Sequence, residues 1–273
     1  MTQRAALYAR FSSDLQSDAS IDDQLRLCRL RAERESWLIV GTFSDKATSG
    51  ALRKRQGLDA LLTELERGRI EPVVKAAYGA PLRIELCGFG AVVAAARTAS
   101  LIAEHRPQAV VLVGIAGRLS DRLRIGEAYA FEQVACHGIG AGTGAAFMPA
   151  ESMGWLQWPA DGLDSATRVG DLLPCTSGRV PATAPRAGLL LSACAASADA
   201  TDVGSRLQLH PDAVAEDMEG FAVAAACRLA GVPLDIVRGI SNTAGDRDRS
   251  HWQIDAACRA AGELTAMLVR GLP

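Results

Sequence analysis

The sequence predicts an α/β fold in which a mixed sheet is flanked by helices. From residue 82 onward, short apolar runs alternate with amphipathic or alanine-rich segments, as strands alternate with the helices that cover them. Small-residue segments at 88–90 and 138–144 fall between these elements, where turns are expected. Hydrophobic residues make up 49% of the 273 residues and charged residues 22%, so the chain can bury the core that such a sheet requires.

The sequence of residues 1–71 predicts a smaller, separate α/β segment. Apolar runs at 5–9 and 37–43 predict two strands. Between them lies an amphipathic helical pattern that opens on a serine N-cap, and a second such helix is expected around 58–65. The periodic pattern then lapses, so we expect a domain boundary that separates residues 1–71 from residues 72–273.

The larger second part begins with a predicted strand at 82–87, a glycine turn and an alanine-rich helix at 91–104. A buried strand is expected at 109–113. Near the C-terminus, a small-residue helix is expected to open around residue 219, followed by an apolar strand at 236–242.

Composition excludes several classes of function. The net charge of −2 gives no general attraction to nucleic acid or to an anionic membrane. Seven cysteines without a CxxC pair and four dispersed histidines favour buried thiols in a reducing cytoplasm over disulfides or a metal site. The N-terminus lacks the apolar core of a signal peptide, and no apolar run reaches the roughly 18 residues of a membrane span.

The first candidate site segment is Val113–Gly117, predicted as a buried strand that ends in a glycine-containing turn. At Gly114, Ala116 and Gly117, small residues let a ligand approach the backbone closely and leave N–H groups facing it. The alternative is that these residues form only a tight connection.

The second candidate is Glu219, which stands with Met218 at a predicted helix start. A carboxylate at this position can serve as an N-terminal cap, but Glu216 and Asp217 could already fill that role. A carboxylate in excess of capping can accept two hydrogen bonds from the vicinal hydroxyls of a ribose. Glu219 is therefore a candidate ribose-binding residue, with the helix cap as the alternative.

The third candidate is the polar pair Ser241–Asn242, which ends an apolar strand. Ligands of open α/β sheets bind at the carboxyl ends of strands, so this pair can face a ligand. The alternative is that Ser241 and Asn242 form a turn or a helix cap.

These segments belong to a longer set of motifs over residues 82–270 that resembles the nucleoside phosphorylase and nucleosidase superfamily. The tail GDRDRSHW is most similar to the futalosine hydrolase branch, nucleosidases of menaquinone biosynthesis. The matching motifs are GFG at 88–90, VGIAG at 113–117, IGE at 125–127, AAFMP at 145–149, EDMEGFAVAAAC at 216–227 and VRGISNTAGDRDRSHW at 237–252.

The resemblance implies a nucleoside phosphorylase-like fold and a role for each motif. Glu219 would bind the 2′ and 3′ hydroxyls of the ribose, Met218 would pack against the sugar, and Asn242 would contact the purine. Phe147 resembles the residue that stacks on the base, while the Gly114–Gly117 segment and Ser241 would line the pocket. The implied reaction is water attack at the anomeric carbon through an oxocarbenium-like state. It uses no metal and no cofactor, and the superfamily suggests a homo-oligomer.

The identity of Asn242 favours a 6-oxopurine. The resembling adenine-specific nucleosidases carry Asp at this position, which suits the N7 acceptor and N6 donor of adenine. Hypoxanthine presents two acceptors, N7 and O6, to which an amide group can donate. An amide also stabilises the negative charge that grows on the departing base. The predicted substrate is therefore a 6-oxopurine nucleoside, with futalosine favoured over methylthioadenosine.

Arg247 and Arg249 are candidates for binding a carboxylate on a remote part of the substrate, because a guanidinium matches carboxylate geometry. The alternative is that these arginines are solvated or pair with Asp246 and Asp248.

The N-terminal segment resembles the catalytic domain of serine recombinases (resolvases and invertases). The resemblance rests on YARFSSDLQ at 8–16, SDK at 44–46 and RQGLD at 55–59, and it implies phosphate chemistry by Ser12. The other residues that would correspond to its site are Tyr8, Arg10, Asp45 and Arg55. The arginine-rich motif that follows in recombinases is absent after residue 73, which opposes recombination and DNA binding.

Superfamily nucleosidases begin with a strand and an acidic residue that positions the attacking water. Before residue 82 the sequence offers no clear counterpart of that strand, and Pro72–Ala77 is the one degenerate substitute. Four hypotheses follow: a futalosine-type or methylthioadenosine-type nucleosidase, a phosphorylase of the same superfamily, a recombinase fragment that binds DNA, and a fusion without catalytic turnover.

Overall fold

The computed structural model describes residues 4–10, 25–26, 28–30, 32–34, 38–45, 83–160, 165–175 and 180–270. The chain separates into two compact units, Met1–Ile84 and Glu85–Pro273. Over the described ranges, no helix has the length and apolarity that crossing a membrane requires.

The N-terminal unit contains a parallel strand pair, β1 (Arg4–Arg10) and β2 (Leu38–Asp45). Parallel neighbours need a crossover connection, and the helical residues described between the two strands bury Leu25 and Ala32. Both predicted strands are thus confirmed. The helix expected around 58–65 and the boundary expected after residue 71 lie outside the described residues.

In the described part of the second unit, six strands form a mixed sheet in the order β10-β3-β9-β8-β4-β7. β10 also pairs with β4, so the strands β10-β3-β9-β8-β4 close into a ring, and β7 extends from β4. β3 and β10 are parallel to each other, as are β4, β8 and β9, and the two groups meet antiparallel. These strands are β3 (Val110–Arg118), β4 (Ala128–His137), β7 (Leu172–Pro174), β8 (Arg186–Ala193), β9 (Ala213–Asp217) and β10 (Leu234–Thr243), besides a short pair β5 (Gly140–Ala141) and β6 (Met148–Pro149).

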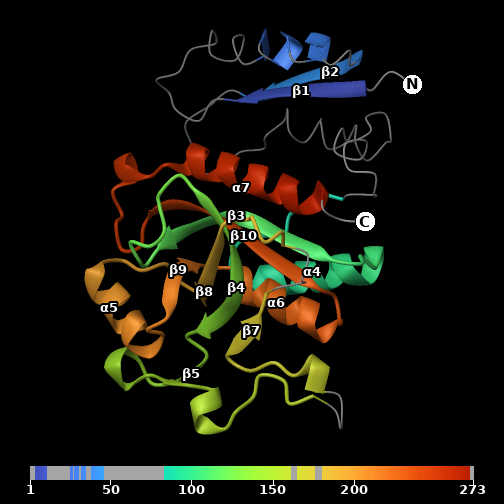
Figure 1. The fold of residues 1–273 in the computed structure, drawn as a ribbon. Coiled ribbons are helices and arrows are strands. Elements are labelled where there is room, and N and C mark those ends of the chain that lie inside the picture. The colour runs from blue at the N-terminus through green and yellow to red at the C-terminus, as the bar shows by residue number, and fades with distance from the viewer. Residues whose placement is uncertain are drawn as a thin grey trace. The chain divides into compact units, whose positions relative to one another are not determined.

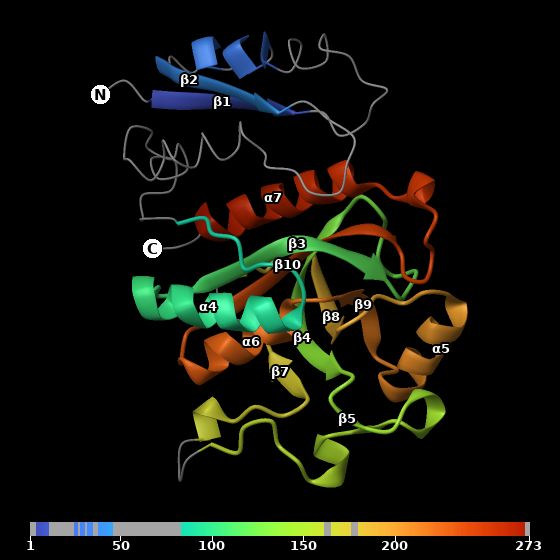
Figure 2. The ribbon, with the colours of Figure 1, turned by 180° about the vertical axis from the view of Figure 1, so that it is seen from behind.

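Helices cover both sides of this sheet, as the two opposite views show (Figure 1, Figure 2). α7 packs on β10 and β3 through a core that includes Val237, Leu264 and Leu268. α4 and α6 pack together on the other side over Phe131 and Ile236. The helices are α4 (Ala91–His105), α5 (Ala200–Leu209), α6 (Gly220–Leu229) and α7 (Ile254–Arg270), with 3-10 turns η1 (Gly144–Ala146), η2 (Glu151–Met153), η3 (Ser165–Thr167) and η4 (Arg249–His251).

The predicted strand at 82–87 is wrong over the residues that are described. Residues 83–88 have no regular secondary structure and pair with none of the described strands. Ile84 and Leu86 alternate with charged residues, which produced the strand prediction, but they are 70% and 79% exposed. Alternation favours a strand only where a neighbouring edge supplies hydrogen bonds, and sequence alone does not show that edge.

The predicted turn at Val113–Gly117 is also wrong, because β3 continues through these residues to Arg118. Glycine is needed here for space rather than for a turn. A Cβ on Gly114 would lie 2.2 Å from Nη1 of Arg238, and one on Gly117 would lie 3.3 Å from Cα of Ala244. The predicted helix at 91–104 and the helix opening at residue 219 are confirmed as α4 and α6.

Candidate active site at the start of α6 and the polar end of β10

The acidic pair Glu216–Asp217 ends β9, and its two side chains bind different groups. Because successive side chains of a strand point to opposite faces, the two carboxylates serve different surroundings. Asp217 accepts hydrogen bonds from Nε of Arg238 at 2.9 Å and Nη2 of Arg238 at 2.5 Å, and also from Oγ of Ser192. Its Oδ2 also accepts from the backbone N–H of Gly220 at 2.9 Å. Asp217 therefore holds the start of α6 and fixes Arg238.

Glu219 occupies the N-cap position of α6, but its side chain makes no capping hydrogen bond. The first N–H groups of the helix are bound by Asp217 and by Oγ of Ser192, which accepts from Phe221 at 2.8 Å. Oε1 of Glu219 instead accepts from the backbone N–H of Gly90 at 2.9 Å. Oε2 lies 3.9 Å from Nη2 of Arg238. The helix is thus capped without the side chain of Glu219, and Oε2 of Glu219 can accept a hydrogen bond from a further donor.

Arg238 is the charged centre of this cluster and is 3% exposed in the middle of β10. Together with Asp217 and Glu219 it gives three formal charges that sum to −1. Such a buried charge is stable only when it is paired and hydrogen-bonded. Cys87 lies near the same charges: burial raises the pKa of its thiol, while the positive charge of Arg238 opposes that rise.

Four of these groups were not identified from the sequence: Gly90, Ser192, Asp217 as a partner of Arg238, and Arg238 itself. One signal could have identified Arg238. An arginine between apolar residues of a strand must find a partner if that strand is buried.

Asn242 lies four residues beyond Arg238 on the same strand, about 13 Å along an extended backbone. It pairs with Gly117 of β3 after a register shift that follows Ile240. Oγ of Ser241 donates to Oδ1 of Asn242 at 2.7 Å, and Nδ2 of Asn242 donates to the carbonyl of Thr243 at 2.8 Å. These bonds orient the amide and leave one of its two N–H groups available to a ligand. The prediction from the sequence required both N–H groups.

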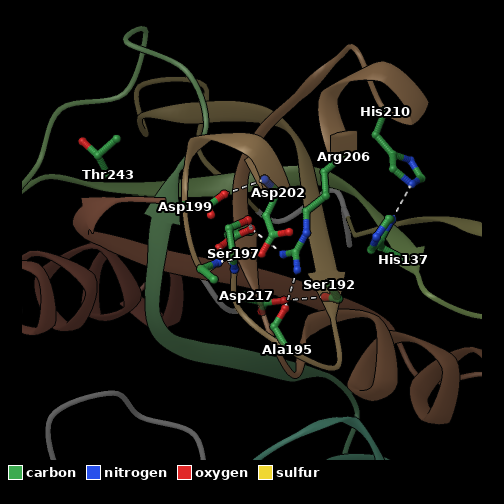
Figure 3. A network of polar contacts seen from close by, with 12 residues as sticks. His137, Ser192, Ala195, Ser197, Asp199, Asp202, Arg206, His210, Asp217 and Thr243 are labelled. Carbon is green, nitrogen blue, oxygen red and sulfur yellow. Dashed lines mark hydrogen bonds and ion pairs between the residues drawn. The ribbon is translucent and has the colours of Figure 1, made fainter. Parts of the chain in front are cut away.

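Phe147 follows η1 and is half-buried. Its ring contacts His137, with centroids 5.6 Å apart, and Nδ1 of His137 lies 3.4 Å from Nε2 of His210. Figure 3 shows this histidine pair beside Arg206. Burial, the charge of Arg206 and the neighbouring His210 together lower the pKa of His137 to about 4. Met218 is half-buried and lies between Asp217 and Glu219 in the sequence.

Arg247 and Arg249 lie on the segment that follows β10. The guanidinium of Arg247 stacks over Trp252, 5.4 Å from the ring centroid. The neighbouring carboxylates bind other groups, Asp246 to His251 at 2.8 Å and Asp248 to the backbone N–H and hydroxyl of Ser250. The segment is tied to the polar end of β10 because the backbone N–H of Gln253 donates to the carbonyl of Ser241 at 2.8 Å.

The recombinase-like residues fall in the first unit. Tyr8 and Arg10 lie on β1, and Asp45 ends β2. Ser12 and Arg55 are outside the described residues. Over the described ranges, no group of three or more His, Cys, Asp or Glu side chains could hold a metal ion.

Comparison with known families gives two matches. Residues 50–272 match the phosphorylase superfamily, and residues 5–77 match the N-terminal domain of resolvases. Residues 50–77 are therefore shared by both matches.

The chain is also similar to individual proteins. It is 30% identical to a futalosine hydrolase of Streptomyces coelicolor over 58% of this chain and 64% of that protein. It is 27% identical to a 5′-methylthioadenosine/S-adenosylhomocysteine nucleosidase of Marinomonas sp. over 67% of this chain and 76% of that protein.

Solved structures share the fold. A 5′-methylthioadenosine/S-adenosylhomocysteine nucleosidase of Neisseria meningitidis matches with a TM-score of 0.54 at 22% identity, covering 68% of this chain and 80% of that one. The S-adenosylhomocysteine nucleosidase of Streptococcus pyogenes matches with a TM-score of 0.56 at 23% identity, covering 68% and 78%.

Proposed function

The chain belongs to the phosphorylase superfamily, and we propose that it hydrolyses the N-glycosidic bond of a 6-oxopurine nucleoside. The observation that carries this proposal is the carboxylate of Glu219. It is held at 2.9 Å by the N–H of Gly90 and keeps an oxygen beside Arg238 for the ribose hydroxyls. Asn242 then lies further along β10, where the base would be bound.

The charges of the site favour hydrolysis over phosphorolysis. Arg238 faces Asp217 at 2.5 Å and Glu219 at 3.9 Å, so its positive charge is already offset. The sum of −1 repels a phosphate nucleophile and stabilises the positive charge that develops on an oxocarbenium-like sugar. Water carries no charge and meets no such repulsion.

The orientation of Asn242 is compatible with a 6-oxopurine. Ser241 donates to Oδ1 of Asn242 and the carbonyl of Thr243 takes one N–H of Nδ2, so the remaining N–H is the donor that is available to the base. This N–H can donate to N7 or O6 of hypoxanthine and stabilise charge on the leaving group. The 30% identity to a futalosine hydrolase makes futalosine the first substrate to test.

Arg247 and Arg249 remain the proposed carboxylate-binding residues for a substrate such as futalosine. Stacking on Trp252 holds the guanidinium of Arg247 in place, while Asp246 and Asp248 bind His251 and Ser250 instead. The segment follows the base end of β10, so these arginines can act only if the substrate's carboxylate reaches that end.

A second candidate is a nucleoside-binding protein without turnover. Both oxygens of Asp217 are engaged by Ser192, Gly220 and Arg238, so Asp217 serves to hold α6 and Arg238 in this arrangement. Glu219 is then the remaining described carboxylate with hydrogen-bonding capacity in this cluster. The superfamily's separate water-positioning acid has no counterpart assigned among the described residues.

The test is an assay of free base with the full chain. Futalosine, inosine and methylthioadenosine are each incubated with the protein, with and without phosphate. Release of hypoxanthine without phosphate, and faster than release of adenine, is the expected result. Release that requires phosphate would replace hydrolysis with phosphorolysis. Binding of inosine without release from any substrate would favour the second candidate.

A further inference from the structure

A buried ion pair lies outside the ribose end of the site, between Arg206 of α5 and Glu216 of β9. Nη1 of Arg206 donates to Oε2 of Glu216 at 2.6 Å, and the two side chains are 10% and 6% exposed. Glu216 also accepts from Ser197 twice, from its N–H at 2.8 Å and its hydroxyl at 2.6 Å. Nη2 of Arg206 donates to the carbonyl of Ala195 at 2.7 Å. The result is a clamp of four hydrogen bonds, in part visible in Figure 3.

The clamp acts on the loop that follows β8, residues 194–198. Ser197 is fully buried, but residues 194–196 are exposed. The clamp therefore fixes exposed backbone rather than a part of the core. Because a buried ion pair adds little net stability compared with apolar residues of the same volume, stability alone does not account for this arrangement.

The fixed loop lies beside the base end of the site. Gly117 of β3 pairs with Glu216 on one side and with Asn242 on the other, so the two residues are about 10 Å apart across adjacent strands. After Asn242, the chain turns at Gly245, where an added Cβ would lie 2.7 Å from the carbonyl of Asp199. Asp199, the residue that follows the clamped loop, thus lies against the turn that follows Asn242.

We propose that Arg206, Glu216 and Ser197 are positioning residues, which hold loop 194–198 as a wall for the base of the bound nucleoside. This rests on the proposed function, since it assigns the base to the Asn242 end. A displaced wall weakens binding of the base but leaves Glu219 and the sugar in place. Loss of the clamp therefore raises KM and the Kd for inosine more than it lowers kcat.

The experiment compares Ser197→Ala, Arg206→Met and Arg206→Lys with the unchanged full chain. Hydrogen–deuterium exchange reports on residues 194–199, and calorimetry gives the Kd for inosine, with kcat and KM measured wherever there is turnover. Thr265→Ala is the matched control, because it removes one hydroxyl-to-carbonyl bond of 2.8 Å within α7.

In Arg206→Met we expect exchange of residues 194–199 and the Kd for inosine each to rise about tenfold, as for the loss of a charged hydrogen bond. Ser197→Ala should show a smaller rise in both, and Arg206→Lys a partial recovery. Thr265→Ala should change neither. kcat should stay within about twofold, since no reacting group is altered.

Two results would overturn the proposal. One is unchanged exchange at 194–199 in both Ser197→Ala and Arg206→Met. The other is faster exchange without any change in the Kd for inosine, which would make the clamp only structural. If the unchanged chain binds inosine but releases no base, the hydrolase proposal fails while the effect of the clamp on binding is still measured.

Discussion

Gly114→Ala is the smallest change that tests whether Arg238 must stay where it lies. The new methyl carbon would be 2.2 Å from Nη1 of Arg238, while ordinary contact begins at 3.4 Å. The guanidinium must therefore move by about 1 Å. Gly114 has no positive φ that would strain an alanine, so the collision is the whole perturbation.

A shift of this size disrupts the bonds from Arg238 to Asp217, which are 2.9 Å and 2.5 Å long. Losing one charged hydrogen bond lowers the free energy of unfolding by about 1.5–3 kcal/mol. A misplacement of about 1 Å near reacting groups can cost about 100-fold in rate. We therefore expect both a loss of stability and a fall in kcat/KM of that order.

Urea unfolding followed by tryptophan fluorescence measures the first quantity, and release of base from inosine measures the second. Gly188→Ala on β8 is the matched control, because its Cβ would meet nothing within 4 Å. A Gly→Ala change at such a site is expected to stabilise the protein slightly. The reasoning is refuted if Gly114→Ala and Gly188→Ala have equal stability and equal kcat/KM.

Three further changes have expected outcomes. Glu219→Gln keeps the acceptor for Gly90 but removes the charge, so kcat/KM should fall about 100-fold or more with little change in unfolding. Asn242→Asp should shift preference from inosine toward adenosine by about tenfold, since a carboxyl oxygen can accept from the N6 donor of adenine but cannot donate to O6 of hypoxanthine. His137 has a pKa lowered to about 4 by burial and by Arg206, so its contribution to stability is full above pH 6.5 and is lost as pH falls toward 4. His137→Gln should remove this loss, about 1–2 kcal/mol after discounting for its partial exposure.

Each outcome has a result that contradicts it. Full activity in Glu219→Gln would remove Glu219 from the ribose site. An unchanged ratio of inosine to adenosine cleavage in Asn242→Asp would place the base elsewhere. An equal acid-induced loss of stability in His137→Gln and in the unchanged chain would show that His137 does not titrate as proposed, and His105→Gln, on the last turn of α4, is the control.

The sequence predicted the helix start at Glu219 because three acidic residues lie where an N-terminal cap needs only one. The structure shows how the helix is capped without Glu219: Asp217 and Ser192 bind the first N–H groups. Ser192 lies on β8, far from α6 in the chain, so a local pattern could not identify it.

Other features depend on contacts that sequence does not contain. Val113–Gly117 reads as a turn because it is rich in glycine, but Gly114 is small to admit Arg238, which lies 124 positions later. Residues 83–88 have strand-like alternation, but a strand forms only against a neighbouring edge. The Arg206–Glu216 clamp joins a helix to a strand through a loop, and although Glu216 begins the EDMEG motif, no motif links it to Arg206.

The most direct test of the account is hydrolysis of a 6-oxopurine nucleoside in water enriched in heavy oxygen, without phosphate. Attack by water at the anomeric carbon predicts free hypoxanthine together with a sugar that carries the heavy oxygen. A sugar phosphate formed only when phosphate is added would contradict hydrolysis. Complete recovery of the intact nucleoside from a protein that binds it would contradict catalysis altogether.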